Sequence, residues 1–425
     1  MKALGTALIV ITGLTLTAAN ETDGLKLPDG FHATVVADGL GPIRHLAVRD
    51  SGDVYVSTPK DAQGKGGGII ALRLDASHRA ITTEHFGDID GGTGIRIAGG
   101  HLYASAPDGV YRFAFDGNAL VPSKAPEAIV EGTPTSHPGF NRTNRPIALD
   151  GKGHLFLALD ASANLCTSPN VPAGGKPLGL KPCPDLGARA GIWQFDANKP
   201  GQKFPGDGVQ LATGIRDMTA LDWSASDDHL FGIMHGRDGT SRTWPDIVSA
   251  DDEDHIADEM HRVAKGTNFG WPYTYFDGAR NVRLVSPEYG GDGRTSPAQG
   301  TYSTPVLTFH SRRSAPVDLL FYSGKQFPAS YRGGAFVVLH GTANRTGYDV
   351  VFVPFERSGK PGRLTVFADG FANFDPSNPA KRADYRPIGI AQGPDGALYI
   401  ADSQKGRIWR VAYDGGRQSD TSQKR

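Results

Sequence analysis

The chain repeats one pattern of apolar and polar positions six times. Each copy has a short apolar run, a turn rich in Gly and Asp, and a second apolar run, as in "RPIALDGKGHLFLALD" (145–160) and "RPIGIAQGPDGALYIAD" (386–402). The copies begin at Ile43, Gly94, Arg145, Ile215, Arg313 and Arg386. Repeats made of several strand-length segments, without helical periodicity, are typical of propellers, in which each repeat forms one blade. The pattern therefore predicts an all-β fold, a six-bladed β-propeller.

Two further segments resemble each other. "FHATVVADGL" (31–40) is similar to "LTVFADGF" (364–371), which leads into the last copy. We expect each to be an outer strand that leads into the inner strand of the next blade. A pair of packed sandwiches is the alternative fold, and the regular order of the copies disfavours it.

Composition agrees with this fold. Of 425 residues, 56 are Gly, 29 are Pro and only 4 are Met, a mixture typical of short strands joined by tight turns. The formal net charge of −1 creates no field that would attract nucleic acid or an anionic membrane. We therefore expect neither as a partner.

The N-terminus has the features of an export signal. An apolar run follows Lys2 and extends to Leu16, and Thr17-Ala18-Ala19 supplies the small residues that a signal peptidase reads. The run is short for a membrane span, and an uncleaved anchor is the alternative. We expect a signal peptide over 1–19, cleavage near Ala19 and a periplasmic protein without a membrane span.

The remaining chain divides into a propeller over 24–415 and a polar tail over 416–425. Its two cysteines, Cys166 and Cys183, can form a disulfide in an oxidising compartment.

Arginines recur just before the predicted innermost strands, at Arg44, Arg145, Arg216, Arg313 and Arg386. The second copy has Thr93-Gly94 instead. These positions lie on one face of a propeller, around its axis, where guanidiniums repel one another unless an anion or acidic side chains lie among them. The pattern favours an anion site. Alternatively, each arginine pairs with a local carboxylate, such as Asp217 or Asp384, and extends outward.

The loops between second and third strands lie on the same face. They carry Asp160, His235-Gly236-Arg237, His340-Gly341 and Asp402. Histidines and carboxylates beside a cationic ring favour acid–base chemistry, with solvated loop residues as the alternative.

Two insertions lengthen this face. Residues 161–188 hold both cysteines, and a Cys166–Cys183 bridge would pin this segment. Residues 246–259 carry seven acidic residues, whose spacing does not match an EF-hand, so a solvated loop is favoured over a calcium site. The neighbouring "GTNFGWPY" (266–273) is expected to plug a junction between blades, with a pocket wall as the alternative.

Several segments resemble the glucose/sorbosone dehydrogenase family. The most specific is "DEMHRVAKGTNFGWP" (258–272), and others are "RAGIWQFDANKPGQ" (189–202), "ATGIRDMTALDW" (212–223), "HGRDG" (235–239), "LLFYSGKQFPASYRGGAFVVLHG" (319–341) and "YRPIGIAQGPDGALYIADSQKGRIWRV" (385–411). The resemblance implies a six-bladed propeller and a periplasmic quinoprotein. Such proteins oxidise aldoses or related aldehydes with pyrroloquinoline quinone (PQQ), a tricarboxylate, and calcium.

The resemblance also implies roles for individual residues. Arg216 and Arg386 match cofactor-binding arginines, and Asp217 stands where the family usually has Asn. Gly236 and Arg237 match positions whose backbone carbonyls hold calcium, while Asp160 and Asp258 match active-site carboxylates. The candidate cofactor-binding residues are Arg145, Arg216, Asp217, His235, Arg313 and Arg386.

The family's catalytic histidine is displaced in this chain. Asn141 or Arg142 stands at its position, and neither is a base at neutral pH. His137 nearby, His340 or His235 would have to replace it, and the candidate catalytic residues are therefore His137, His340, Asp160 and Asp258.

The leading hypothesis is a PQQ- and calcium-dependent dehydrogenase of a sugar or aldehyde. No Cys-x-x-Cys-His motif is present, so electrons would leave to a separate soluble acceptor. Two alternatives remain: a ligand-binding propeller without redox chemistry, and a calcium-dependent lactone hydrolase.

Overall fold

The chain forms a six-bladed β-propeller, as the repeat predicts. A computed structural model describes residues 23–135, 144–169, 171, 175–309, 314–342, 345–375, 377–378 and 380–415. The proposed signal peptide, the tail over 416–425, His137 and Arg313 lie outside these residues. No helix in the described part of the chain is long and apolar enough to cross a membrane.

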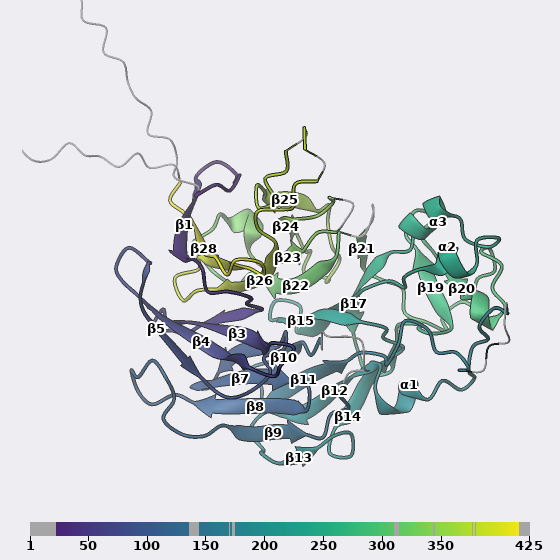
Figure 1. Ribbon diagram of the computed structural model, residues 1–425, viewed down its shortest axis with the longest axis horizontal. Helices are drawn as coiled ribbons and strands as arrows, with labels where there is room; N and C mark the ends of the chain where they lie inside the picture. Colours follow the sequence, from purple (N-terminus) through teal and green to yellow (C-terminus); the bar gives the residue numbers. More distant parts are fainter. Residues whose placement is uncertain are drawn as a thin grey trace, which may run out of the picture.

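The blades are antiparallel sheets arranged in sequence order (Figure 1). Within each blade the strands follow one another from the axis outward. The first blade contains β2 (Leu46–Val48), β3 (Val54–Lys60), β4 (Gly66–Leu74) and β5 (Ala80–Phe86). The second contains β6 (Ile95–Ala98), β7 (His101–Ala106), β8 (Gly109–Ala114) and β9 (Glu127–Glu131). The third contains β10 (Ile147–Leu149), β11 (His154–Leu159), β12 (Gly191–Asp196) and β14 (Val209–Thr213).

The other three blades follow the same plan. The fourth contains β15 (Met218–Ser224), β16 (His229–Met234), β17 (Asp258–Val263) and β21 (Leu307–Phe309). The fifth contains β22 (Pro316–Phe321), β23 (Ala335–Leu339), β24 (Asp349–Val353) and β25 (Thr365–Ala368). The sixth contains β26 (Pro387–Gln392), β27 (Leu398–Asp402), β28 (Ile408–Tyr413) and, outermost, β1 (Phe31–Ala37).

Strand β1 closes the ring because it joins the two ends of the propeller chain. It pairs antiparallel with β28, with Phe31 opposite Tyr413 and Ala33 opposite Val411. The expectation that 31–40 forms an outer strand is therefore confirmed.

Buried apolar side chains hold neighbouring blades together. Val56 and Ile70 of the first blade lie in one cluster with Ile388 and Tyr399 of the sixth. Carboxylates add specific links, since Asp318 Oδ2 of the fifth blade accepts a hydrogen bond from Ile390 N of the sixth at 2.8 Å. Such bonds satisfy buried backbone donors between sheets.

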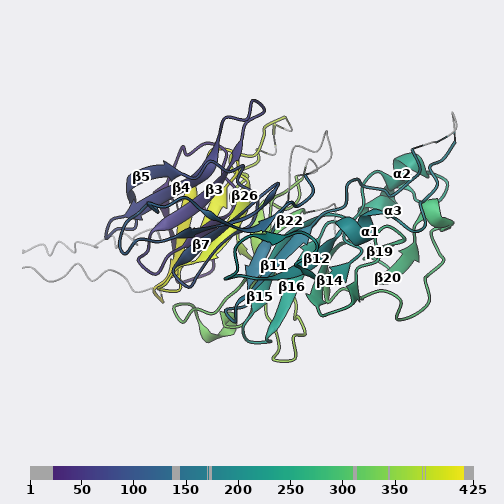
Figure 2. The ribbon, with the colours of Figure 1, turned by 90° about the horizontal axis from the view of Figure 1, so that it is seen from below.

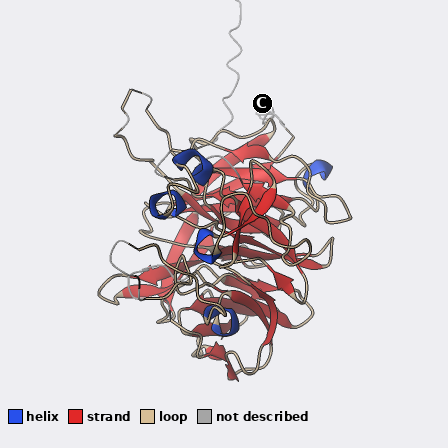
Figure 3. Ribbon diagram, turned by 90° about the vertical axis from the view of Figure 1, so that its right-hand side faces the viewer, coloured by secondary structure: helices blue, strands red, loops and turns tan. Residues whose placement is uncertain are grey.

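Insertions in the third and fourth blades build a lobe on one side of the propeller (Figures 1 and 2). It contains the hairpin of β19 (Thr274–Asp277) and β20 (Val282–Val285) and three short helices, α1 (Asp185–Ala188), α2 (Thr240–Thr243) and α3 (Ala250–Asp254). Two short strands, β13 (Gln202–Lys203) and β18 (Thr267–Asn268), extend the second and third blades in parallel. Single 3₁₀ turns occur at Pro287–Tyr289 and Ala329–Tyr331, so strands dominate the structure (Figure 3).

The acidic segment 246–259 is partly ordered by its own carboxylates. Ser249 and Asp252 form a reciprocal capping box at the start of α3. Glu253 accepts hydrogen bonds from Gly239 N and Ser241 N, both at 2.5 Å. Part of this segment therefore supports the preceding residues Gly239–Ser241. The expectation of a solvated loop is wrong for this part.

Candidate functional site

A pocket of about 310 Å³ lies where the innermost strands of all six blades begin. Each blade contributes a residue just before or at the start of its innermost strand: Arg44, Thr93, Arg145, Arg216, Ala315 and Arg386. The pocket is therefore on the propeller axis. Of the arginines singled out in the sequence, Arg44, Arg145, Arg216 and Arg386 meet at this site, and Arg313 stays a prediction.

Among the described residues, five arginines line this pocket: Arg44, Arg145, Arg189, Arg216 and Arg386. Arg189 was not anticipated, because it precedes the third strand of its blade rather than the first. Its Nε donates to the backbone carbonyl of Asp160 at 2.8 Å. This contact holds the guanidinium at the edge of the pocket.

Arg145 is the most enclosed of the five, with 1 % of its surface exposed. Its Nη2 donates to Pro134 O at 2.6 Å and its Nη1 to Asn144 O at 3.1 Å, whereas its buried Nε has no hydrogen-bond partner among the residues described. Burial lowers the pKa of Arg145 to about 10, and the nearby charge of Asp160 opposes this shift. An orphaned donor on a buried cation is the feature that an anionic ligand would satisfy.

Arg216 is held from three sides. It donates from Nε to Asn164 Oδ1 at 2.8 Å, from Nη1 to Gly236 O at 2.7 Å and from Nη2 to Asp238 Oδ2 at 2.6 Å. Its acidic partner is thus Asp238 rather than the adjacent Asp217, and the guanidinium faces the pocket rather than extending outward.

Arg386 belongs to the loop that enters the sixth blade. Its Nη2 donates to Gly341 O at 2.7 Å and approaches His340 Nδ1 at 3.0 Å. Asp384, the alternative partner considered from sequence, instead accepts hydrogen bonds from Asn373 and Lys381.

β-Bulges direct apolar and hydroxyl groups into the pocket. The innermost strands of blades four, five and six each shift register at their second residue. The extra residues are Thr219, Val317 and Ile388, and all three line the pocket. Bulges commonly re-aim side chains in this way.

Two carboxylates, Asp160 and Asp217, face the arginines with opposite shifts of pKa. Burial, reinforced by the charge of Asp217, raises the pKa of Asp160 well above its usual value. Burial would also raise the pKa of Asp217, but contacts with His235, Arg216 and Asn144 outweigh it and lower the value to about 2. Asn144 Nδ2 donates to Asp217 Oδ1 at 2.6 Å. Asp217 is therefore ionised, while Asp160 readily holds a proton.

In the described part of the chain, three histidines border the pocket. His235 Nε2 lies 2.8 Å from Pro316 O and must donate to it, while Nδ1 lies 3.6 Å from Asp217 Oδ2. Burial lowers the pKa of His235, but Asp258 and Asp217 outweigh this effect and raise it overall. His340 contacts Arg386 through Nδ1 and Ser403 Oγ through Nε2, at 2.9 Å. His45, missed in the sequence, donates from Nδ1 to Thr93 O, and its buried Nε2 has no hydrogen-bond partner in the described ranges.

Other predicted site residues lie behind the pocket wall. Asp258 Oδ1 accepts from Gly236 N at 2.9 Å. The side chain of Arg237 forms a buried ion pair with Glu288, at 3.0 Å. Asp402 accepts from the backbone N–H of Arg386 at 2.6 Å and of Lys405 at 2.7 Å, so it shapes a loop.

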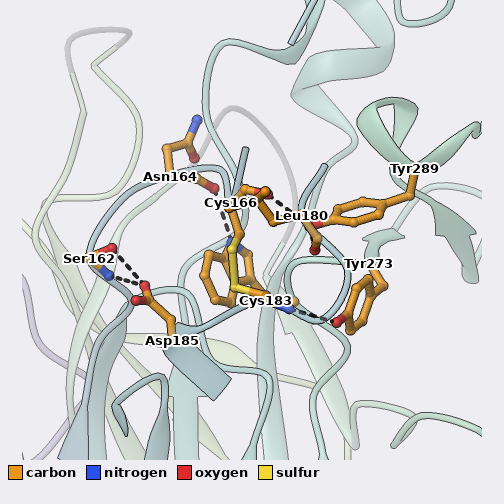
Figure 4. Close-up of a disulfide and its surroundings, with 9 residues drawn as sticks. Ser162, Asn164, Cys166, Leu180, Cys183, Asp185, Tyr273 and Tyr289 are labelled. Atoms are coloured by element: carbon orange, nitrogen blue, oxygen red, sulfur yellow. Dashed lines mark hydrogen bonds between the residues drawn. A yellow bond between two sulfur atoms is a disulfide. The ribbon is translucent and has the colours of Figure 1, made fainter. Parts of the chain in front are cut away.

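The segment 161–188 is pinned as the sequence predicts, because Cys166 and Cys183 form a disulfide (Figure 4). Trp271 packs against both cysteines and Ala190. The Gly-Trp-Pro stretch is thus a plug beneath this segment rather than a wall of the pocket.

We expect loss of the disulfide to lower the stability of the protein. Replacing both Cys166 and Cys183 by alanine releases a loop with a sequence separation of 17. The expected cost is about 2–3 kcal/mol, because the unfolded chain regains conformational freedom. Thermal unfolding under oxidising conditions measures it, and the same melting temperature in the variant and the parent would contradict the expectation.

Comparison with known proteins agrees with the fold. A structure of the family AA12 carbohydrate-active enzyme of Trichoderma reesei, with calcium, is similar over 94% of this chain and 100% of that one (TM-score 0.71, 17% identity). The holo form of the pyranose dehydrogenase PQQ domain of Coprinopsis cinerea is similar over 91% of this chain and 97% of that one (TM-score 0.69, 17% identity). The PQQ-bound aldose sugar dehydrogenase of Streptomyces coelicolor is similar over 92% and 100% (TM-score 0.53, 16% identity).

Among curated sequences, an uncharacterised protein of Borreliella burgdorferi is 24% identical over 208 residues. The match covers 48% of this chain and 48% of that protein, so the chain spans about half the length of this relative. A family model described as TrAA12-like matches residues 25–414, which include all six blades. The chain therefore belongs to the TrAA12-like family, in agreement with its resemblance to the glucose/sorbosone dehydrogenases.

Proposed function

We propose that this protein is a periplasmic quinoprotein that binds PQQ in the arginine-lined pocket and oxidises an aldose or related aldehyde. The carrying observation is the convergence of five arginines on one axial pocket, in which the described residues contribute only two carboxylates, Asp160 and Asp217. The five guanidiniums outnumber the two carboxylates. The excess of positive charge is larger still because Asp160 readily holds a proton. Electrons would leave to a separate soluble acceptor.

The residues of the pocket fit a tricarboxylate. Arg145 carries a buried Nε without a partner, and guanidiniums bind carboxylates with paired donors. The family membership and the PQQ named for two of the similar structures support the same ligand. Arg44, Arg145, Arg189, Arg216 and Arg386 would hold it.

The predicted calcium position fits less simply. The carbonyl oxygen of Gly236 already accepts a hydrogen bond from the cationic Arg216, and the side chain of Arg237 is committed to Glu288. A calcium ion at Gly236 would have to share this oxygen with a guanidinium, which like-charge repulsion disfavours. Calcium dependence therefore belongs to the proposal as a separate, testable part.

When bound, PQQ would supply a two-electron acceptor, and the protein would supply binding and proton transfer. The arginines neutralise and orient the anion. Asp160 is the described side chain best suited to accept a hydroxyl proton, because its raised pKa makes its ionised form a stronger base. His340 and His235 are less suited, since Arg386 contacts the former and two carboxylates favour the protonated form of the latter.

The test is dye-linked oxidation by the metal-free apoprotein, with PQQ and calcium added separately and together, over a panel of aldoses and sorbosone. We expect turnover only when PQQ is present, and a need for both additions would support the calcium part. An absorbance shift of PQQ without turnover would favour the second candidate, a binding propeller. The observation that favours this candidate is that His340 and His235 are engaged in hydrogen bonds with the protein itself. If PQQ produces neither an absorbance shift nor turnover, both candidate functions are overturned.

A further inference from the structure

We propose that Asn164 is a positioning residue that fixes Arg216 in its ligand-binding orientation and couples it to the disulfide-pinned segment. The inference rests on the proposed function, in which Arg216 contacts the anionic cofactor. It concerns a residue of the insertion 161–188 that no sequence motif marks.

Asn164 joins two loops through one amide group. Its Oδ1 accepts hydrogen bonds from Arg216 Nε at 2.8 Å and from Asp238 N at 3.0 Å. Its Nδ2 donates to Asp238 O at 2.6 Å. Because Asp238 Oδ2 also accepts from Arg216 Nη2 at 2.6 Å, the three residues form a closed arrangement through two side chains and both the backbone and side chain of Asp238.

This arrangement determines which donors of Arg216 remain for a ligand. A guanidinium carries five N–H groups in one plane. Arg216 uses one on Nε for Asn164, one on Nη1 for Gly236 O and one on Nη2 for Asp238. The described residues leave the other two available, and because Arg216 lines the pocket, a ligand there can accept from them. The plane of the guanidinium is fixed by partners at each nitrogen.

Asn164 is itself held by the region around the disulfide (Figure 4). The backbone carbonyl of Asn164 accepts a hydrogen bond from Trp271 Nε1 at 3.0 Å, and Cys166 follows two residues later. On either side, Ser162 Oγ donates to Asp185 at 2.7 Å, and Tyr289 Oη donates to Cys166 O at 2.9 Å. The Gly-Trp-Pro plug thus acts through Asn164 on a residue of the pocket.

The test is a double-mutant cycle of Asn164→Ala and Arg216→Ala, with PQQ affinity measured by titration calorimetry in the presence of calcium. We expect Asn164→Ala to weaken binding about 3- to 10-fold, because Arg216 loses one fixed partner without losing its charge. In the Arg216→Ala background, the same change should cost nothing further, since no guanidinium remains to be positioned. A purely structural role for Asn164 would weaken binding equally in both backgrounds.

Lys176→Ala is the matched control. Lys176 lies in the same insertion, contacts the exposed Asp246 at 3.1 Å, and is not among the described residues that line the pocket. We expect it to leave affinity unchanged. If Asn164→Ala binds PQQ as tightly as Lys176→Ala does, or if its cost is the same with and without Arg216, the positioning role is wrong.

A second readout does not depend on PQQ. In ¹H–¹⁵N spectra of the apoprotein, the Nε–H of Arg216, assigned by its loss in Arg216→Ala, should be protected from exchange in the parent and in Lys176→Ala. It should exchange faster in Asn164→Ala. If the parent binds no PQQ, the proposed function fails, and this signal alone decides the positioning role: protection unchanged by Asn164→Ala overturns it.

Discussion

Replacing Asp160 with asparagine is expected to lower kcat of the PQQ-loaded protein by about 10²- to 10⁴-fold, the usual contribution of a positioned general base. The affinity for PQQ should stay the same. Asparagine is uncharged and similar in shape to the protonated carboxyl, which burial favours in the free protein. Steady-state kinetics and calorimetric titration at pH 7 measure the two quantities separately.

The pH profile sharpens this prediction. The pKa of Asp160 is raised by burial, so its basic form is present only at pH values above that raised pKa. Turnover of the parent should therefore fall as the pH is lowered through the raised pKa of Asp160. The pH–rate profile of Asp160→Asn should not show this fall.

A different base is the competing possibility. His137 lies outside the described residues and remains a prediction from the sequence. His137→Asn is the matched variant: if it abolishes turnover while Asp160→Asn retains it, the base is His137 and the role given to Asp160 is wrong.

Replacing Arg145 with methionine should affect binding and stability in opposite directions. We expect PQQ affinity to fall about 100-fold, because a desolvated charged hydrogen-bond donor is lost from the pocket. The apoprotein should be as stable as the parent or more stable, since a buried cation with an orphaned Nε is replaced by an apolar side chain of similar length. Calorimetric titration and thermal unfolding of the apoprotein measure the two effects.

Arg112→Met is the control for this variant. Arg112 is also buried, but it forms an ion pair with Glu127 at 2.6 Å and lies outside the pocket. We expect it to lower stability and leave PQQ affinity unchanged. Equal PQQ affinity of the Arg145 and Arg112 variants would exclude Arg145 from the binding site.

The architecture could be predicted because local sequence patterns determine it. Short apolar runs separated by Gly- and Asp-rich turns specify strands and turns wherever they occur, and six copies specify six blades. The same reasoning located Arg44, Arg145, Arg216 and Arg386, because a position fixed relative to the innermost strand is fixed relative to the axis. The pairing of Cys166 with Cys183 followed from their being the two cysteines of the chain.

The direction of each side chain was decided only by the tertiary structure. Arg237 turns to Glu288, 51 residues away, and Asp402 caps a loop, although both come from loops on the predicted face. Arg189 and Asn164 join the pocket from outside the repeat positions. Their places depend on partners such as Trp271, 107 residues beyond Asn164, which no local pattern relates to them.

The sequence by itself thus determined the strands, their grouping into blades and the axial position of a cationic site, since each depends on spacing within one repeat. Only the tertiary structure decided which charges face the pocket, which are neutralised behind it, and that Asp160 rather than Asp217 readily holds a proton. The physical reason is that burial and hydrogen bonding set the cost of a charge, and both are properties of the packed loops rather than of the chain.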